Sequence, residues 1–222
     1  MDYVIKKLNK MKNGYLDISW SSLTELPNSL LWKEVKELHC YRNHLTSLPD
    51  LPNVEYLDCH NNQLITLPDL PNVKDLNCYN NQLTTLPDLP NVKDLNCSNN
   101  QLTCLPDLPK VKTLNCHHNQ LTKLPYLPNI ENLYCGNNQL TRLPDLPNVK
   151  DLYCYDNLLI YKPKNRKIFN AIFRIISTQK MFKHWWVVVQ QYRQERTYQI
   201  INKVPEFDIL PEEIKLYIIR FV

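Results

Sequence analysis

Glycine is almost absent from this chain. Only 2 of its 222 residues are glycine, which excludes a glycine-rich loop that cradles phosphate groups. The sequence also has no HExxH zinc motif and no set of serine, histidine and aspartate arranged for nucleophilic catalysis. We therefore predict that the protein is not an enzyme and uses no cofactor, catalytic residue or small-molecule substrate.

Long apolar runs are missing as well. A membrane-spanning helix needs about 20 consecutive apolar residues, and the longest candidate here, residues 185–189, is far shorter. The N-terminal stretch MDYVIKKLNKMKN places lysines between its apolar residues, so it lacks the apolar core of a signal peptide. These absences predict an intracellular, cytoplasmic protein.

Proline, in contrast, is frequent and regularly placed. Thirteen of the 16 prolines lie between Pro27 and Pro147, too evenly spaced and among too many leucines and valines for a disordered linker. Leu-Pro pairs start at residues 48, 67, 86, 105, 124 and 143, each 19 residues apart, after a 22-residue unit that starts at Leu26. A fixed period of this length is typical of a solenoid.

Every unit repeats one pattern: in one copy the apolar positions are Val54, Leu57, Cys59 and Leu64, with Asn62 fixed among them. This LxxLxCxxNxL pattern resembles a leucine-rich repeat, and its LPxLP form resembles the short repeats of secreted bacterial effector proteins. The resemblance covers residues 14–161. It implies a parallel β-solenoid with about eight strands and a protein-binding concave strand face.

Backbone geometry leads to the same architecture. Side chains alternate along a strand, so Leu57 and Cys59 point inward while residues 56, 58 and 60 point outward. Proline disfavours helix, so the LPDLP segments predict an extended convex side. Val4, Leu8 and Met11 fall on one face of a short basic helix, and residues 1–13 are predicted to cap the first repeat.

Two positions of the repeat keep the same residue from unit to unit, one a cysteine and the other an asparagine, and each set is predicted to stack as a column along the solenoid. Seven of the eight cysteines share one inward position, where strand spacing keeps alternate thiols roughly 9.6 Å apart, too far for a shared tetrahedral zinc. We interpret them as small, reduced core residues. A column of asparagines, Asn62 among them, is predicted to satisfy backbone groups where each strand turns.

The outward strand positions are where the repeats differ, and tyrosine, histidine and aspartate gather there. Tyrosine provides contact area at low entropic cost, so these positions are typical of a protein-binding surface, although they also fit merely solvated positions. His60 and His117 are too far apart to share a metal. The predicted partner-binding residues are Tyr41, Tyr56, Asp58, His60, Asp75, Tyr79, Asp94, His117, Tyr134, Asp151, Tyr153 and Tyr155.

Residues 162–203 differ in composition from the repeats. They carry ten lysines and arginines against one acid, whereas residues 1–161 carry 14 basic and 17 acidic residues. Apolar residues at helical spacing predict a helical segment that closes the last repeat. Binding of RNA or an anionic membrane is a secondary alternative, because no nucleic-acid motif accompanies the positive charge.

Residues 204–222 end in LPEEIKLYIIRFV, which resembles the opening of an F-box. That family docks its first helix on the adaptor of a cullin ubiquitin ligase, but an F-box is longer than this segment. Repeats followed by a short F-box-like helix resemble a poxvirus arrangement, which would place the protein in the host cytoplasm. The residues implied are Leu210, Pro211, Glu213, Ile214, Ile218, Ile219 and Phe221.

The sequence thus predicts a recognition protein that binds another protein through its strand face. A ubiquitin-ligase adaptor and an RNA- or membrane-associating protein remain the alternatives. The catalytic cysteine of a bacterial-effector ubiquitin ligase is not expected, because the last cysteine, Cys154, lies inside the repeats.

Overall fold

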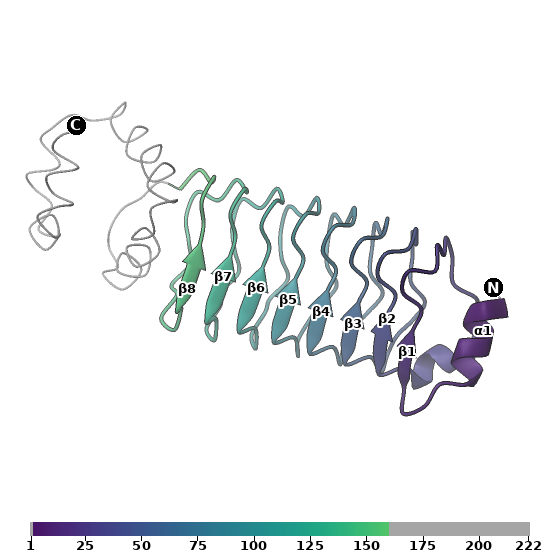
Figure 1. Cartoon of the computed structure of the whole chain (residues 1–222). Coiled ribbons are helices and arrows are strands. Elements are labelled where there is room, and N and C mark those ends of the chain that lie inside the picture. Colours follow the sequence, from purple (N-terminus) through teal and green to yellow (C-terminus); the bar gives the residue numbers. More distant parts are fainter. Residues whose placement is uncertain (1, 160–222) are drawn as a thin grey trace, which may run out of the picture. The chain divides into compact units, whose positions relative to one another are not determined.

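The computed structural model describes residues 2–159 and contains one parallel sheet (Figure 1). Its eight strands follow one another in chain order. The predicted basic segment 162–203 and the F-box-like segment 204–222 lie outside the described residues. The strands are β1 (Tyr15–Asp17), β2 (Glu37–His39), β3 (Tyr56–Asp58), β4 (Asp75–Asn77), β5 (Asp94–Asn96), β6 (Thr113–Asn115), β7 (Asn132–Tyr134) and β8 (Asp151–Tyr153).

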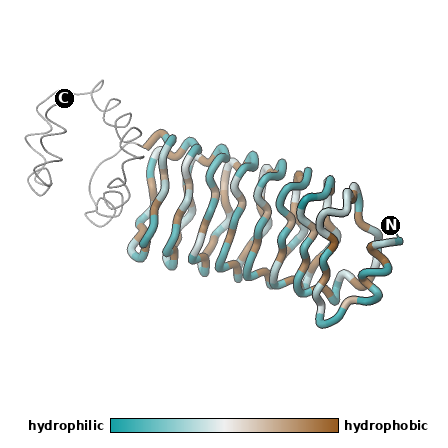
Figure 2. The backbone as a smooth tube through the Cα atoms, in the orientation of Figure 1, coloured by the Kyte–Doolittle hydropathy of each residue, from teal (hydrophilic) through white to brown (hydrophobic). Residues whose placement is uncertain are grey.

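The core is a column of leucines and cysteines that repeats from unit to unit. Leu57 and Cys59 are fully buried, as are Val54, Leu51 and Leu64 of the same unit. Polar and apolar stretches recur at matching places in successive turns (Figure 2). The prediction that cysteine is a core residue is confirmed for six of the seven column members, while Cys154 in the last turn is half-buried.

The chain returns between strands in extended form, as the prolines predict. In each LPDLP segment the second leucine is buried, whereas the first is only partly buried against the core. A turn follows, in which the Val54 backbone N–H donates to the Leu51 carbonyl at 3.3 Å. Asn72 Nδ2 then donates to the Pro52 carbonyl of the preceding unit at 2.8 Å, a ladder on the convex side that the sequence analysis did not predict.

The asparagine column holds the turns together in the way the sequence predicts. Asn62 Nδ2 donates to the carbonyls of Cys40 and Cys59 at 3.0 and 3.1 Å. Asn62 Oδ1 accepts from the Leu45 backbone N–H at 3.0 Å. Because each amide spans two units, the column joins neighbouring turns through their backbones.

The residue before each column asparagine has a left-handed backbone, with φ of 53° at Asn61 and 54° at Asn80. Asparagine tolerates this conformation better than most residues, which explains how the turns form in a chain with two glycines. Trp20 and Arg42 occupy the same position, and the Arg42 guanidinium lies 4.2 Å from the Trp20 ring centroid.

Two short helices lie in the N-terminal part of the chain, before β2. Helix α1 (Asp2–Asn9) buries Val4 and Leu8, as predicted for a short N-terminal helix, whereas Met11 lies beyond its end and is only partly buried. The 3-10 helix η1 (Leu30–Glu34) falls in the 22-residue unit and was not predicted; its Trp32 is buried and donates Nε1–H to the Pro27 carbonyl at 2.8 Å. No helix within residues 2–159 is long and apolar enough to span a membrane.

Candidate interaction face

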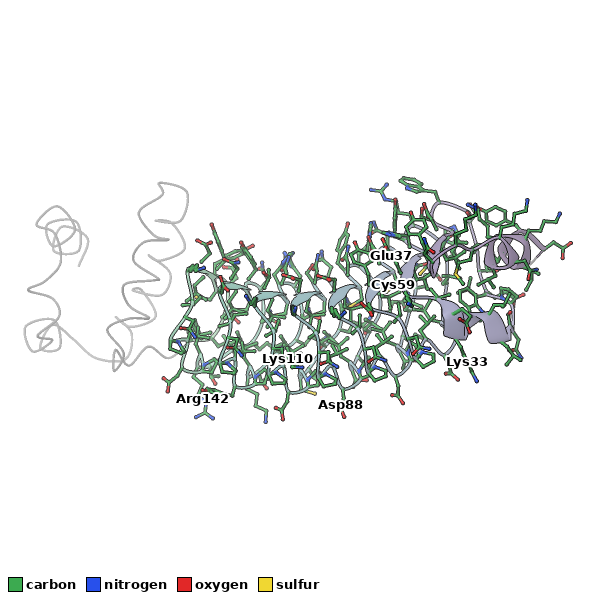
Figure 3. The ribbon with its side chains drawn as sticks, turned by 90° about the horizontal axis from the view of Figure 1, so that it is seen from below. Lys33, Glu37, Cys59, Asp88, Lys110 and Arg142 are labelled. Atoms are coloured by element: carbon green, nitrogen blue, oxygen red, sulfur yellow. The ribbon has the colours of Figure 1, made fainter. Side chains whose placement is uncertain are left out.

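We define the strand face as the first and third residues of each strand and the residue two positions further on. In β3 these are Tyr56, Asp58 and His60, which alternate with buried Leu57 and Cys59. Strand pairing continues beyond β3, since the Arg42 N–H donates to the His60 carbonyl at 2.9 Å. The backbone beneath all three positions is therefore fixed. In Figure 3, Glu37 lies beside the strands and Asp88 lies on the opposite side of the solenoid.

Six rings over β1 to β4 form what we call the aromatic cluster. His39 lies 5.5 Å from Tyr15 and 5.1 Å from Tyr56 between ring centroids. His39 also meets Tyr41 edge-on, with centroids 6.4 Å apart, and this contact joins Tyr15, His39 and Tyr56 to the rings of Tyr41, His60 and Tyr79. The members of the cluster are Tyr15, His39, Tyr41, Tyr56, His60 and Tyr79.

Three of these rings form a stack. His60 lies between Tyr41 and Tyr79, with centroids 4.7 and 5.2 Å away and interplanar angles of 6° and 22°. Asp58 Oδ1 lies 2.5 Å from His60 Nδ1 and holds the ring in this position. Because the ring faces within the stack cover one another, mainly ring edges and tyrosine hydroxyl groups are left to contact a ligand.

A second aromatic group lies over β7 and β8. The rings of Tyr134 and Tyr153 stack with centroids 5.0 Å apart. Tyr155 lies over Gly136, where an added Cβ would come within 2.9 Å of its ring. One of the two glycines in the chain is thus explained by close approach of a neighbouring side chain.

Between the two aromatic groups the face is polar and acidic. Asp75 of β4 and Asp94 of β5 are direct partners in the sheet register. The pKa of Asp75 is raised, first because burial disfavours its charge and then because of the charge on Asp94. Ser98 is buried, and its hydroxyl donates to Asn96 Oδ1 at 2.7 Å.

His117 lies at the same level of the face as Ser98, one strand further on. Its Nδ1 is hydrogen-bonded to Asn115, and its ring meets that of His118 edge-on at 5.1 Å. Burial lowers the pKa of His117, and the neighbouring His118 lowers it further. At neutral pH this ring is therefore uncharged.

The cysteine column is buried except at Cys154, which is half-buried. Within residues 2–159, no group of three or more histidines, cysteines, aspartates or glutamates is placed to hold a metal ion. Burial raises the pKa of Cys97 and of Cys154 to about 12, and it raises the pKa of the other column cysteines too. These thiols are protonated and unreactive at neutral pH.

The structure places all twelve predicted partner-binding residues on the strand face, but in different environments. Tyr41, Tyr56, His60 and Tyr79 come together in the aromatic cluster. Asp58 points outward but is only 8% exposed, because His60 and its neighbours cover it; its role is to orient His60. Asp151, Tyr134, Tyr153 and Tyr155 lie at the far end, and Asp75, Asp94 and His117 lie between.

Sequence reasoning missed Tyr15 and Glu37 as members of the face and left His39 out of the binding set. The register pairs Tyr15 with Glu37 and Glu37 with Tyr56. The irregular 22-residue unit hid this alignment. Counting back from the asparagine column, Asn43 to Asn62, would have recovered Glu37 but not Tyr15, because serine occupies the column position at Ser21.

The comparisons with known proteins agree with this geometry. The family model described as leucine-rich repeats (2 copies) matches residues 33–72, 71–110 and 109–148, which together span just over half of the chain. No curated protein sequence gives a significant match.

Several solved structures are similar. YopM, a leucine-rich effector protein from Yersinia pestis, is 33% identical over 71% of this chain and 54% of that chain, with a TM-score of 0.58. The leucine-rich repeat domain of a Shigella effector is 28% identical over 80% of this chain and 84% of that chain, with a TM-score of 0.65. The chain spans about half the length of the Yersinia pestis protein.

Proposed function

Because this chain belongs to the leucine-rich repeat family, we propose that it is a non-enzymatic recognition protein that binds a protein partner through its strand face. Repeat solenoids use an extended, rigid surface of this kind for binding. The similar solved structures include effector proteins of Yersinia and Shigella, which is consistent with a protein whose task is to engage other proteins.

The observation that carries the proposal is the aromatic cluster. Tyr15 is 49% exposed, and Tyr41, Tyr56 and Tyr79 are partly exposed on a hydrogen-bonded backbone. Their neighbours restrain them before any partner arrives, so little side-chain entropy remains to be lost on binding. Tyrosines held in this way are typical anchors of protein interfaces.

A photo-crosslinking amino acid at position 113 of the strand face tests the proposal, with position 88 on the opposite side as the matched control (Figure 3). After irradiation in cell extract, we expect a discrete protein adduct from position 113 and none from position 88. The adduct should disappear in the Tyr41→Ser/Tyr56→Ser variant. Equal adducts from both positions, or cross-links only to residues 162–203 of the same chain, would contradict the proposal.

Two alternatives follow from the sequence outside the described residues. Residues 210–222 support a ubiquitin-ligase adaptor, which predicts that the intact chain captures the cullin adaptor and that a version ending at Asp208 does not. The positive charge of residues 162–203 supports association with RNA or membrane. That function predicts binding to RNA or to anionic vesicles that weakens steeply with added salt.

A further inference from the structure

The strand face carries charge of one sign. Its 24 positions include six acids, Asp17, Glu37, Asp58, Asp75, Asp94 and Asp151, and no lysine or arginine. This is not the composition of the repeats in general, since residues 1–161 contain 14 lysines and arginines. Lysine and arginine are therefore absent from the strand face, although they occur at neighbouring positions of the repeats.

The nearest lysines form a rim one residue before the strands, and most of that rim is paired. Lys74 Nζ lies 2.5 Å from Glu55, and Lys112 and Lys150 both pair with Glu131, at 3.5 and 2.5 Å. These lysines are bound to rim carboxylates rather than to the acids of the face.

Three of the six acids are already used within the protein. Glu37 Oε1 lies 2.9 Å from His39 Nε2. Asp17 accepts hydrogen bonds from the backbone N–H and hydroxyl of Ser19, and Asp58 holds His60. Asp75 and Asp94 differ, because they stand directly opposite each other on β4 and β5. Like charges in that arrangement destabilise a sheet. Burial and the charge of Asp94 raise the pKa of Asp75. The positive charges of Lys93 and Lys74 lower it by less, so the pKa of Asp75 is raised overall.

The aromatic cluster borders this acidic pair. Tyr56 is the register partner of Asp75, and Tyr79 lies two residues beyond the end of β4. The pKa of Tyr56 is raised, first by burial and then by the charges of Asp58, Asp75 and Glu37. The phenol ring therefore lies in a negative field. Lysine and arginine side chains bind carboxylates and also lie favourably against aromatic rings.

We propose that the partner bound by the strand face is a basic polypeptide segment, which lays a lysine or arginine side chain across Tyr56, Asp75 and Asp94. This inference rests on the proposed function and specifies the chemistry of the partner. A bound cation removes the repulsion between the two carboxylates. An acidic segment meets the like charges of Asp75 and Asp94 and is rejected.

A random 12-residue peptide library displayed on phage, selected on the intact chain, tests the inference. We expect the selected peptides to be enriched in lysine and arginine over aspartate and glutamate. Their binding, measured by fluorescence anisotropy, should weaken about tenfold in the Asp75→Asn/Asp94→Asn variant, the loss of two partly exposed ion pairs. It should also weaken as salt screens the charges.

The matched control is Asp69→Asn/Asp88→Asn, which makes the same change of charge in exposed LPDLP segments of the same repeats. This control should bind the peptides within twofold of the unmodified chain. Folding of the test variant is safeguarded, because asparagine already occupies the equivalent position at Asn132.

The outcomes separate the two proposals. Peptides that lose binding in Tyr56→Ser but show no excess of basic residues would overturn the inference and leave protein recognition intact. Peptides that respond equally to the test and control charge variants would overturn the inference as well. If no selected peptide responds to any strand-face substitution, the proposed function itself fails.

Discussion

Replacing Asn100 by alanine tests whether the asparagine column holds the solenoid together. Asn100 Oδ1 accepts from the Leu83 N–H at 3.0 Å, and its Nδ2 donates to the carbonyls of Cys78 and Cys97 at 3.0 and 3.1 Å. The substitution removes all of these bonds at once. Their costs are unequal, because the groups left behind differ in what else they contact.

The two carbonyls keep a second donor. Cys78 O still accepts from Asn81, and Cys97 O still accepts from Asn119. Each lost bond to them costs about 1 kcal/mol. The Leu83 N–H has no other hydrogen-bond acceptor within the described residues, and an unsatisfied N–H costs about 1–3 kcal/mol. We therefore expect the Asn100→Ala variant to lose about 3–5 kcal/mol of unfolding free energy.

Guanidinium unfolding of the full chain, followed by circular dichroism, measures the loss. The control is Asn72→Ala on the convex side, which removes one exposed bond to the Pro52 carbonyl and should cost less than about 1 kcal/mol. If Asn100→Ala costs no more than this control, the column is not what joins the turns.

An isosteric variant separates hydrogen bonding from volume. In Asn100→Asp the oxygen facing the Leu83 N–H is kept, but a second carboxylate oxygen replaces the donor to Cys78 and Cys97. Desolvation raises the pKa of a carboxyl placed there, so the variant should be least stable at neutral pH. It should regain stability as acid protonates the group. Stability that does not change with pH would contradict this account.

Three further predictions concern single positions. Cys104 is the one exposed cysteine of eight, so a thiol reagent at neutral pH should modify one cysteine rapidly, and Cys104→Ser should abolish this fast phase. NMR titration should give His117 a pKa below its ordinary value of 6.5, and His118→Asn should raise it. The stability that neutral His117 contributes should be lost as pH falls below about 6.5, because protons then bind preferentially to the unfolded chain. Gly136→Ala should displace the Tyr155 ring and cost about 1 kcal/mol, and Tyr155→Ser should relieve most of that cost.

The fold was largely predictable because burial is specified within each unit. Leu57, Cys59 and Asn62 define a strand, a core position and a turn within six residues of sequence, and repetition fixes how units stack. The 3-10 helix was missed because it occurs once, in the unit that departs from the period. The hydrogen bonds between units on the convex side, such as Asn72 to the Pro52 carbonyl, were not predicted. An asparagine next to a proline indicates a turn but not which group its side chain will bond.

The interaction face was only partly predictable. Alternation along the strand identified Tyr56, Asp58 and His60 as outward residues. It gave no means of distinguishing Asp58, which is enclosed by its neighbours, from Asp75, which faces Asp94 across the sheet. Contacts between side chains of neighbouring repeats, 19 residues apart in sequence, depend on strand register and on side-chain rotamers. Neither can be read from the sequence of a single repeat.

The sequence by itself thus determined the solenoid, its strands, its buried cysteines and its asparagine column, because each follows from patterns shorter than one unit. Tertiary structure alone decided that Tyr15 and His39 join the aromatic cluster, that His60 is stacked between tyrosines, and that Tyr155 needs Gly136. The physical reason is that these contacts form between neighbouring strands, where the stacking distance of the sheet, and not the order of residues, sets which side chains meet.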